Sequence, residues 1–128
     1  MVYWKGHTLS NEVLLKPISN LDVLPTLAQW TKSKPPANTL DGQSISGFLT
    51  TKNYNQSHRP IYYHNTKLEG VKEGDWKLRI TQKDSGELRE LFNLAWDPSE
   101  RVNLFEYPKY SKEKEHLLQL FKEFPKGK

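Results

Sequence analysis

The chain has 128 residues and a formal net charge of +4, with 35% hydrophobic residues, 12% aromatic residues and a mean hydropathy of −0.80. This length fits one small domain or part of a larger one, no apolar run approaches the length of a membrane span, and the lack of cysteine excludes disulfides and thiolate metal sites. Lysines and acidic residues are interspersed, so the charge favours a solvated surface over a nucleic-acid interface, and it would also suit an anionic substrate.

The first part of the chain shows one strand-like and one helical pattern. Val2–Trp4 is apolar and β-prone, so we expect the last part of a strand there, closed by a turn at Lys5–Gly6. Because the chain begins inside this pattern, we expect a truncated protein. Ser19 or Asn20 is the expected N-cap of a helix over about Asp22–Thr31. Its apolar face repeats every three residues, at Leu21, Leu24, Leu27 and Trp30.

A short helical turn and a polar loop follow. Asp41–Gly42 predicts a turn. The next apolar residues suit a helical turn under the core: Ile45, Phe48 and Leu49. Residues 50–59 are polar and are the best candidate for a boundary, so we divide the chain into residues 1–58 and residues 59–128.

The second part has the pattern of four short strands separated by turn residues. Gly74–Asp75 and residues 83–86 are turn sequences, and links this short require an antiparallel meander. The expected strands are Pro60–His64, Leu68–Lys72, Trp76–Thr81 and Glu90–Leu94. In the third strand, alternation directs three residues toward the core, namely Trp76, Leu78 and Ile80. Lys77 and Arg79 then face outward.

Helical signals close the chain. The run from Asp97 to Glu100 has a capping Asp, then Pro, then Glu three residues on, so we expect one helical turn before Asn103. Ser111 should cap a final helix that Pro125 ends. Its apolar stripe is Leu117, Leu118, Phe121 and Phe124. Together these patterns predict an α+β fold, a small four-stranded antiparallel sheet packed by a C-terminal helix.

The sequence contains no self-sufficient active site. The aspartates fall at turns or helix starts, where they cap backbone N–H groups, and no cluster of oxygens suits a hard cation. No histidine has metal-ligand spacing, and no nucleophile elbow or glycine-rich phosphate loop occurs. His7 and His58 lie in expected loops, and His116 lies on the final helix. His64 ends a strand and could project into a cleft, with an ordinary strand-end histidine as the alternative.

Six short motifs follow one another along nearly the whole chain. They are Val2–His7, Leu21–Leu27, Leu40–Ser44, Val71–Leu78, Glu90–Leu94 and Asp97–Leu104. Each is weak alone, but in this order they resemble the C-terminal portion of the sulfatase family, the arylsulfatase-type enzymes. The chain departs from the family pattern at Lys5, where Pro is usual, and at Lys72, where Arg is usual.

The resemblance implies a parent enzyme that hydrolyses sulfate esters of aryl or carbohydrate substrates and is periplasmic, secreted or lysosomal. Residues 1–58 would be a strand–helix remnant of its α/β catalytic domain, and residues 59–128 the smaller C-terminal sheet subdomain. The family's nucleophile is a formylglycine made from Cys/Ser-x-Pro-x-Arg, and Ca²⁺ polarises the sulfate. This chain contains neither that motif nor the Asp-Asn-Gly metal motif. No catalytic or metal residue carries over, and we expect no activity without the missing catalytic half.

The resemblance also implies a supporting role, because the C-terminal subdomain in this family lends loop residues to the substrate pocket. The candidates lie between the first two strands: Tyr63, His64, Asn65 and Lys67. His64 or Lys67 could hydrogen-bond a sugar hydroxyl or a second sulfate.

Two other functional classes remain open. One is a stand-alone module that holds anionic polysaccharide with aromatic and lysine side chains, and the other is a small basic nucleic-acid-binding domain. The burial of the first part separates them from the sulfatase fragment. A fragment should expose Val2–Trp4 and the Leu21 face of the helix, whereas an independent module should bury both.

Overall fold

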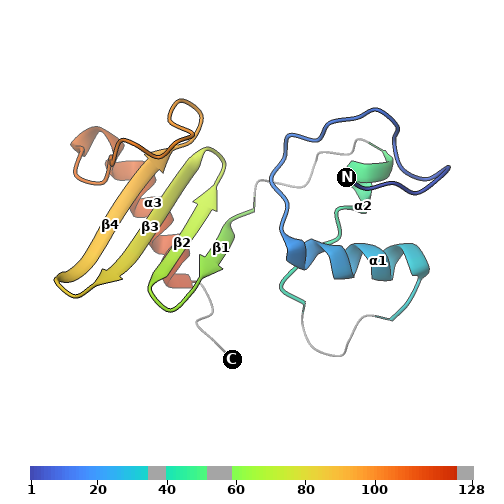
Figure 1. Cartoon of the computed structure of the whole chain (residues 1–128), viewed down its shortest axis with the longest axis horizontal. Helices are drawn as coiled ribbons and strands as arrows, with labels where there is room; N and C mark the ends of the chain where they lie inside the picture. The colour runs from blue at the N-terminus through green and yellow to red at the C-terminus, as the bar shows by residue number, and fades with distance from the viewer. Residues whose placement is uncertain (35–39, 52–58, 124–128) are drawn as a thin grey trace. The chain divides into compact units, whose positions relative to one another are not determined.

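The computed structural model describes residues 1–34, 40–51 and 59–123. The chain divides into two compact units, Met1–Ser57 and His58–Lys128 (Figure 1). His58 itself lies outside the described residues, as do Phe124 and Pro125, so the expectations placed on those three are not addressed. Within the described part of the chain, no helix has the length and apolar character needed to cross a membrane.

The first unit is built around one helix with a capped start. A 3-10 turn, η1 (Asn20–Asp22), leads directly into α1 (Val23–Thr31). Ser19 is the N-cap of η1. The two residues Ser19 and Asp22 form a capping box, in which the Ser19 side chain accepts from the backbone N–H of Asp22 and the Asp22 side chain accepts from the backbone N–H of Ser19. Lys32 closes α1 in the left-handed conformation, with φ 54°. The predicted helix is therefore confirmed, and of the two expected caps Ser19 caps the 3-10 turn that leads into it.

The strand expected at Val2–Trp4 does not form, and this expectation is wrong. No strand pairing includes these residues, and the chain instead turns back at once, because the Trp4 carbonyl accepts from the backbone N–H groups of both His7 and Thr8 at 3.0 Å. A strand needs a neighbouring backbone to pair with, and none of the described strands includes these residues. The predicted turn is present, with Gly6 at φ 77°.

A second short helix, α2 (Ser46–Thr50), gives the first unit its small core. Ile45 and Phe48 are buried, as predicted for a helical turn beneath the core. Thr26 of α1 links the two helices, because its hydroxyl accepts the backbone N–H of Ile45 at 3.0 Å and donates to the Asp22 carbonyl at 2.6 Å.

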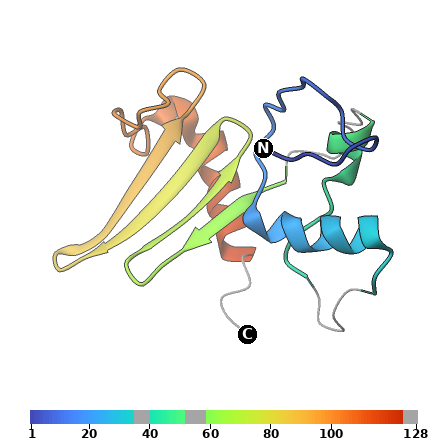
Figure 2. The same cartoon turned by 45° about the vertical axis from the view of Figure 1, so that its right-hand side comes forward.

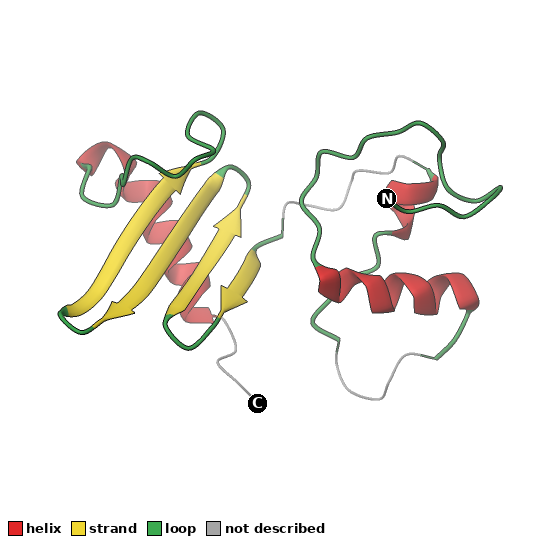
Figure 3. Cartoon of the chain, in the orientation of Figure 1, coloured by secondary structure: helices red, strands yellow, loops and turns green. Residues whose placement is uncertain are grey.

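The second unit is a four-stranded antiparallel sheet in the order β1-β2-β3-β4, which confirms the predicted meander (Figure 3). The strands are β1 (Ile61–His64), β2 (Leu68–Glu73), β3 (Trp76–Lys83) and β4 (Gly86–Asn93). β4 begins four residues earlier than expected, because β3 and β4 pair all the way to Lys83 and Gly86 and leave a two-residue turn.

One helix covers one face of this sheet. The 3-10 turn η2 (Pro108–Tyr110) leads into α3 (Ser111–Glu123), which lies behind the strands in Figures 1 and 2. The core between them is fully apolar: Val71, Leu78, Ile80, Leu91, Leu104 and Leu117. Trp76 packs at its edge, with its ring 5.4 Å from that of Tyr110. The α+β architecture predicted from the sequence is confirmed.

The helical turn expected after Asp97 is absent. Glu100 adopts a left-handed conformation with φ 53°, which a right-handed helix cannot contain. The Asp97 carboxylate instead accepts from the backbone N–H groups of Arg101 and Val102, at 2.8 and 2.9 Å. The Asp residue caps a loop rather than a helix. Asn103 then ties that loop to the sheet by accepting the N–H of Leu91 at 3.0 Å.

Candidate functional site

Two of the four candidate residues, Tyr63 and His64, lie in β1, whereas Asn65 and Lys67 lie in the loop that leads to β2, and the structure gives the four different roles. Tyr63 lies on the outer face of the sheet, opposite α3, and its hydroxyl donates to the carbonyl of Leu78 at 3.1 Å. Its ring lies across Gly70, where an added Cβ would be only 2.5 Å from the ring. Burial, followed by the charge of Glu100, raises the pKa of the Tyr63 phenol. Tyr63 therefore packs and braces the sheet.

Asn65 shapes the loop itself. Its side-chain oxygen accepts the backbone N–H groups of Lys67 and Leu68 at 3.0 and 2.8 Å, an Asx turn that fixes the path from β1 to β2. An amide engaged in this way is a structural element, and it presents Lys67 at the loop.

His64 and Lys67 are exposed candidates whose side chains do not shape the loop. The His64 ring pairs with Glu69, its neighbour across the β1–β2 ladder, with Nδ1 2.9 Å from the carboxylate oxygen and 58% of the side chain exposed. Because Glu69 engages Nδ1, Nε2 is the ring nitrogen that a ligand could reach. Lys67 is exposed in the loop that follows β1.

An ion-pair network on the outer face was not foreseen. Arg79 donates two hydrogen bonds to the Glu90 carboxylate, at 2.8 and 3.0 Å, and a third to Glu100 at 3.2 Å. Lys77 pairs with Glu100 as well. The sequence places Lys77 and Arg79 on this face by alternation, but only the cross-strand register and the path of the loop bring the carboxylates to them. The network holds the loop that contains Glu100 on the sheet.

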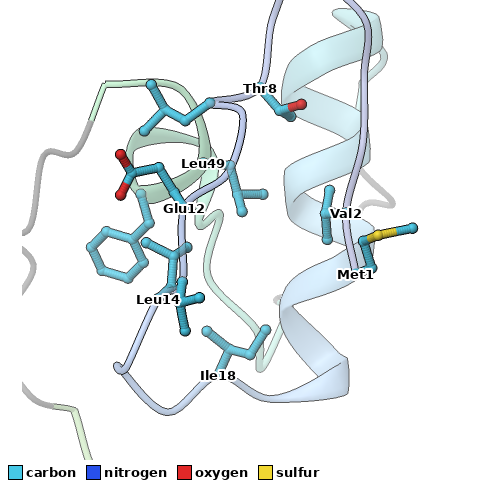
Figure 4. Close-up of a pocket in the computed structure, with 10 residues that line it drawn as sticks. Met1, Val2, Thr8, Glu12, Leu14, Ile18 and Leu49 are labelled. Carbon is cyan, nitrogen blue, oxygen red and sulfur yellow. The ribbon is translucent and has the colours of Figure 1, made fainter.

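An apolar hollow of about 420 Å³ opens on the first unit (Figure 4). It is lined by Met1, Val2, Thr8, Leu9, Glu12, Val13, Leu14, Ile18, Phe48 and Leu49. Only Thr8 and Glu12 bring polar side chains to this lining. Such a surface suits contact with apolar side chains better than binding of a charged small molecule.

The described residues do not offer Ca²⁺ a set of donors. Among residues 1–34, 40–51 and 59–123, no group of three or more His, Asp or Glu side chains converges. The two buried carboxylates, Asp22 and Asp97, are engaged by backbone N–H groups.

Several solved structures with a similar fold are sulfatases. The chain aligns with a 2-O GAG sulfatase at 28% identity and a TM-score of 0.65, and with a putative sulfatase from Bacteroides thetaiotaomicron VPI-5482 at 28% identity and a TM-score of 0.64. Each of these two alignments covers 80% of this chain and 23% of the sulfatase chain. A third structure, solved with its substrate D-glucosamine-2-N,6-O-disulfate, matches over 80% of this chain and 22% of its own, at 22% identity and a TM-score of 0.66.

The fold is therefore that of the C-terminal portion of a sulfatase, as the six motifs indicated. The family model for the C-terminal region of N-sulphoglucosamine sulphohydrolase matches residues 1–126, and the chain belongs to this family. It spans less than a quarter of the length of the solved sulfatases that it matches.

Proposed function

We propose that this chain is the C-terminal part of a sulfatase that removes sulfate from a carbohydrate, and that it acts only together with a catalytic domain. The observation that carries this proposal is the family match over residues 1–126, combined with the small share of the solved sulfatases that the chain covers. The catalytic domain would supply the formylglycine nucleophile and Ca²⁺, for which the described residues have no counterpart.

The exposed apolar surface of the first unit supports this proposal. Four apolar residues at the start of and along α1 leave between 48% and 53% of their surface exposed: Leu21, Val23, Leu24 and Leu27. Other large apolar residues nearby in the sequence are also exposed: Val2, Tyr3, Val13, Leu15 and Ile18. On α3, by contrast, Leu117 is buried against its own sheet. An apolar surface of this size favours coverage by another folded part, and we assign that part to the catalytic domain.

We further propose that His64 and Lys67 contact the substrate of the parent enzyme. Both are exposed, both could donate hydrogen bonds to a sulfate or hydroxyl, and Glu69 orients the His64 ring. The substrate of one structural relative is D-glucosamine-2-N,6-O-disulfate, a sugar with two anionic groups. His64 or Lys67, outside the catalytic centre, could recognise a second anionic group of this kind.

Two measurements test the proposal. Reading the gene directly upstream of the Met1 codon should show an in-frame continuation that encodes Cys/Ser-x-Pro-x-Arg. Purified chain alone should show no turnover of an aryl sulfate or of N-sulfoglucosamine, whereas the same chain joined to that continuation should be active. Metal-dependent turnover by the chain alone would overturn the proposal.

The role of the loop is tested in the joined enzyme. His64→Ala and Lys67→Ala should each raise KM about three- to tenfold and change kcat little, because they remove binding outside the reacting centre. Lys112→Ala, which removes an exposed lysine on α3, is the matched control. Unchanged KM at both positions would show that the loop does not reach the substrate.

A further inference from the structure

We propose that a cleft in the first unit binds a saccharide ring carrying an anionic substituent. The cleft has a volume of about 490 Å³. It is lined by Trp4, Gly6, His7, Gln29, Trp30, Lys32, Ser46 and Thr50. None of these residues belongs to the β1–β2 loop or to the apolar hollow of Figure 4. The inference goes beyond the proposed function, because it concerns binding by this chain and requires no catalytic domain.

The wall of the cleft is aromatic. The Trp4 and His7 rings are stacked almost in parallel, with centroids 4.1 Å apart and planes 5° apart, and the Trp30 ring lies 4.8 Å from Trp4 at 53°. An aromatic face has a negative quadrupole, which attracts the weakly positive C–H groups on one side of a pyranose ring. The exposed His7 ring extends this surface toward solvent.

These rings are held in place before any ligand binds. The hydroxyl of Thr8 accepts the backbone N–H of Trp4 at 2.9 Å and donates to the Trp4 carbonyl at 3.2 Å, which fixes the turn that stacks His7 on Trp4. The Trp30 indole N–H donates to the Ser46 hydroxyl at 2.7 Å. At Gly6 an added Cβ would meet nothing within 4 Å, so this edge of the cleft is open. Such preorganisation lowers the entropic cost of binding.

The charge of the cleft selects an anionic ligand. Lys32 contributes an ammonium group from the end of α1, and Gln29 lies one turn before it. No carboxylate is among the eight lining residues. A sulfate or carboxylate on the sugar would pair with Lys32 while the ring contacts the aromatic wall. A single lysine is too few for nucleic acid, whose binding depends on several phosphate contacts.

The four tryptophans provide the test, because two line the cleft and two lie in the second unit. Indole N–H signals of the isotope-labelled full chain are followed by NMR during titration with a fully sulfated heparin-derived disaccharide. We expect the signals of Trp4 and Trp30 to shift and those of Trp76 and Trp96 to stay. The desulfated, N-acetylated disaccharide should bind at least about threefold more weakly, since it has lost every sulfate and keeps only the uronate carboxylate to pair with Lys32.

Substituted variants test whether the disaccharide binds in the cleft. Lys32→Gln should weaken binding of the sulfated disaccharide about three- to fivefold, the usual worth of an exposed ion pair, and Lys112→Gln on α3 should leave it unchanged. His7→Ala should weaken the sulfated and the desulfated disaccharide by a similar factor, because it removes stacking surface and no charge. Spectra of the free variants establish that each one is folded.

Three outcomes would overturn the inference. They are unmoved Trp4 and Trp30 signals, equal effects of Lys32→Gln and Lys112→Gln, and tighter binding of a single-stranded oligonucleotide than of the sulfated disaccharide. All of these readouts measure binding to the chain itself. A parent enzyme without sulfatase activity would therefore contradict the proposed function and leave this inference standing.

Discussion

The buried carboxylate of Asp22 accepts a hydrogen bond from the backbone N–H of Gln43, 21 residues further along the chain, at 2.9 Å. Its second oxygen accepts from the backbone N–H of Ser19 at 2.8 Å, and Asp22 is only 1% exposed. One side chain thus closes the capping box of η1 and fixes the turn that precedes α2. The two sequence motifs at Leu21–Leu27 and Leu40–Ser44 are halves of a single structural element.

Replacing Asp22 should destabilise the first unit strongly. Asp22→Ala removes two charge-assisted hydrogen bonds and leaves two backbone N–H groups without this partner, so we expect a loss of about 2–4 kcal/mol in unfolding free energy. The loss of unfolding free energy is measured by urea denaturation, with amide hydrogen exchange in α1 as the probe of the first unit. Asp41→Ala, at an exposed carboxylate in the same turn, is the control. An equal loss for both variants would contradict the role assigned to Asp22.

Two glycine substitutions should differ in cost for different physical reasons. At Gly42 an added Cβ would lie 1.9 Å from the carbonyl oxygen of Leu21, so Gly42→Ala must move backbone and should cost at least about 3 kcal/mol. Gly74 has φ 55° with open space around it, so Gly74→Ala should cost about 1 kcal/mol from backbone strain alone. Thermal unfolding of both variants measures the difference. Equal costs would show that the close approach at Gly42 relaxes freely.

The buried Tyr63 phenol should make the second unit sensitive to alkali. Its pKa is raised above the ordinary value of 10.0, first by burial and then by the charge of Glu100. Below pH 10 both the folded and the unfolded state keep the proton, and stability is fully present. Above pH 10 the unfolded state ionises first, so stability is lost as pH rises. Tyr62, whose pKa burial also raises, adds in the same direction.

The Tyr63→Phe variant tests this linkage. It should lose about 1 kcal/mol at pH 8, because the hydrogen bond to the Leu78 carbonyl disappears, and its stability should then fall less steeply between pH 10 and pH 11 than that of the unsubstituted chain. Unfolding free energies at several pH values give both slopes. Tyr107→Phe, at an exposed tyrosine, should change neither quantity. Parallel pH profiles for the Tyr63 variant and the original chain would refute the prediction.

The loop after β4 should depend on Asp97. Asp97→Ala removes the acceptor for the backbone N–H groups of Arg101 and Val102, and we expect a loss of about 1–3 kcal/mol together with faster amide exchange at both positions. Asp84→Ala, at the exposed β3–β4 turn, serves as the comparison. Unaltered exchange at Arg101 and Val102 would mean that the loop is held without the carboxylate.

Local signals in the sequence were sufficient for most of the fold. Short turns such as Gly74–Asp75 leave adjacent strands no partner except each other, so alternation and turn chemistry alone predict the meander. The cap at Ser19 is likewise predictable from the local sequence, since its hydrogen-bond donors and acceptors lie within one helical turn. These features are decided by residues that are neighbours in the chain.

The structure predictions that were wrong concern segments whose conformation depends on contacts outside the local motif. Val2–Trp4 has strand-forming side chains, but a strand also requires a partner backbone, which no propensity reveals. The Asp97 motif matches a helix cap in every local respect, and only the left-handed Glu100 and the anchoring of Asn103 to β4 divert it. In the candidate site, the packing of Tyr63 over Gly70 follows from cross-strand register, which the sequence left unassigned.

The strand order of the second unit has a kinetic consequence. Every strand pairs only with its neighbour along the chain, through two tight turns and one short loop, so little loop-closure entropy is spent before contacts form. We expect this unit to refold on the millisecond timescale, roughly as other mixed α/β domains with local contacts do. The docking of α3 onto β2 and β3 is the step that joins segments far apart in the sequence, and it should set the rate.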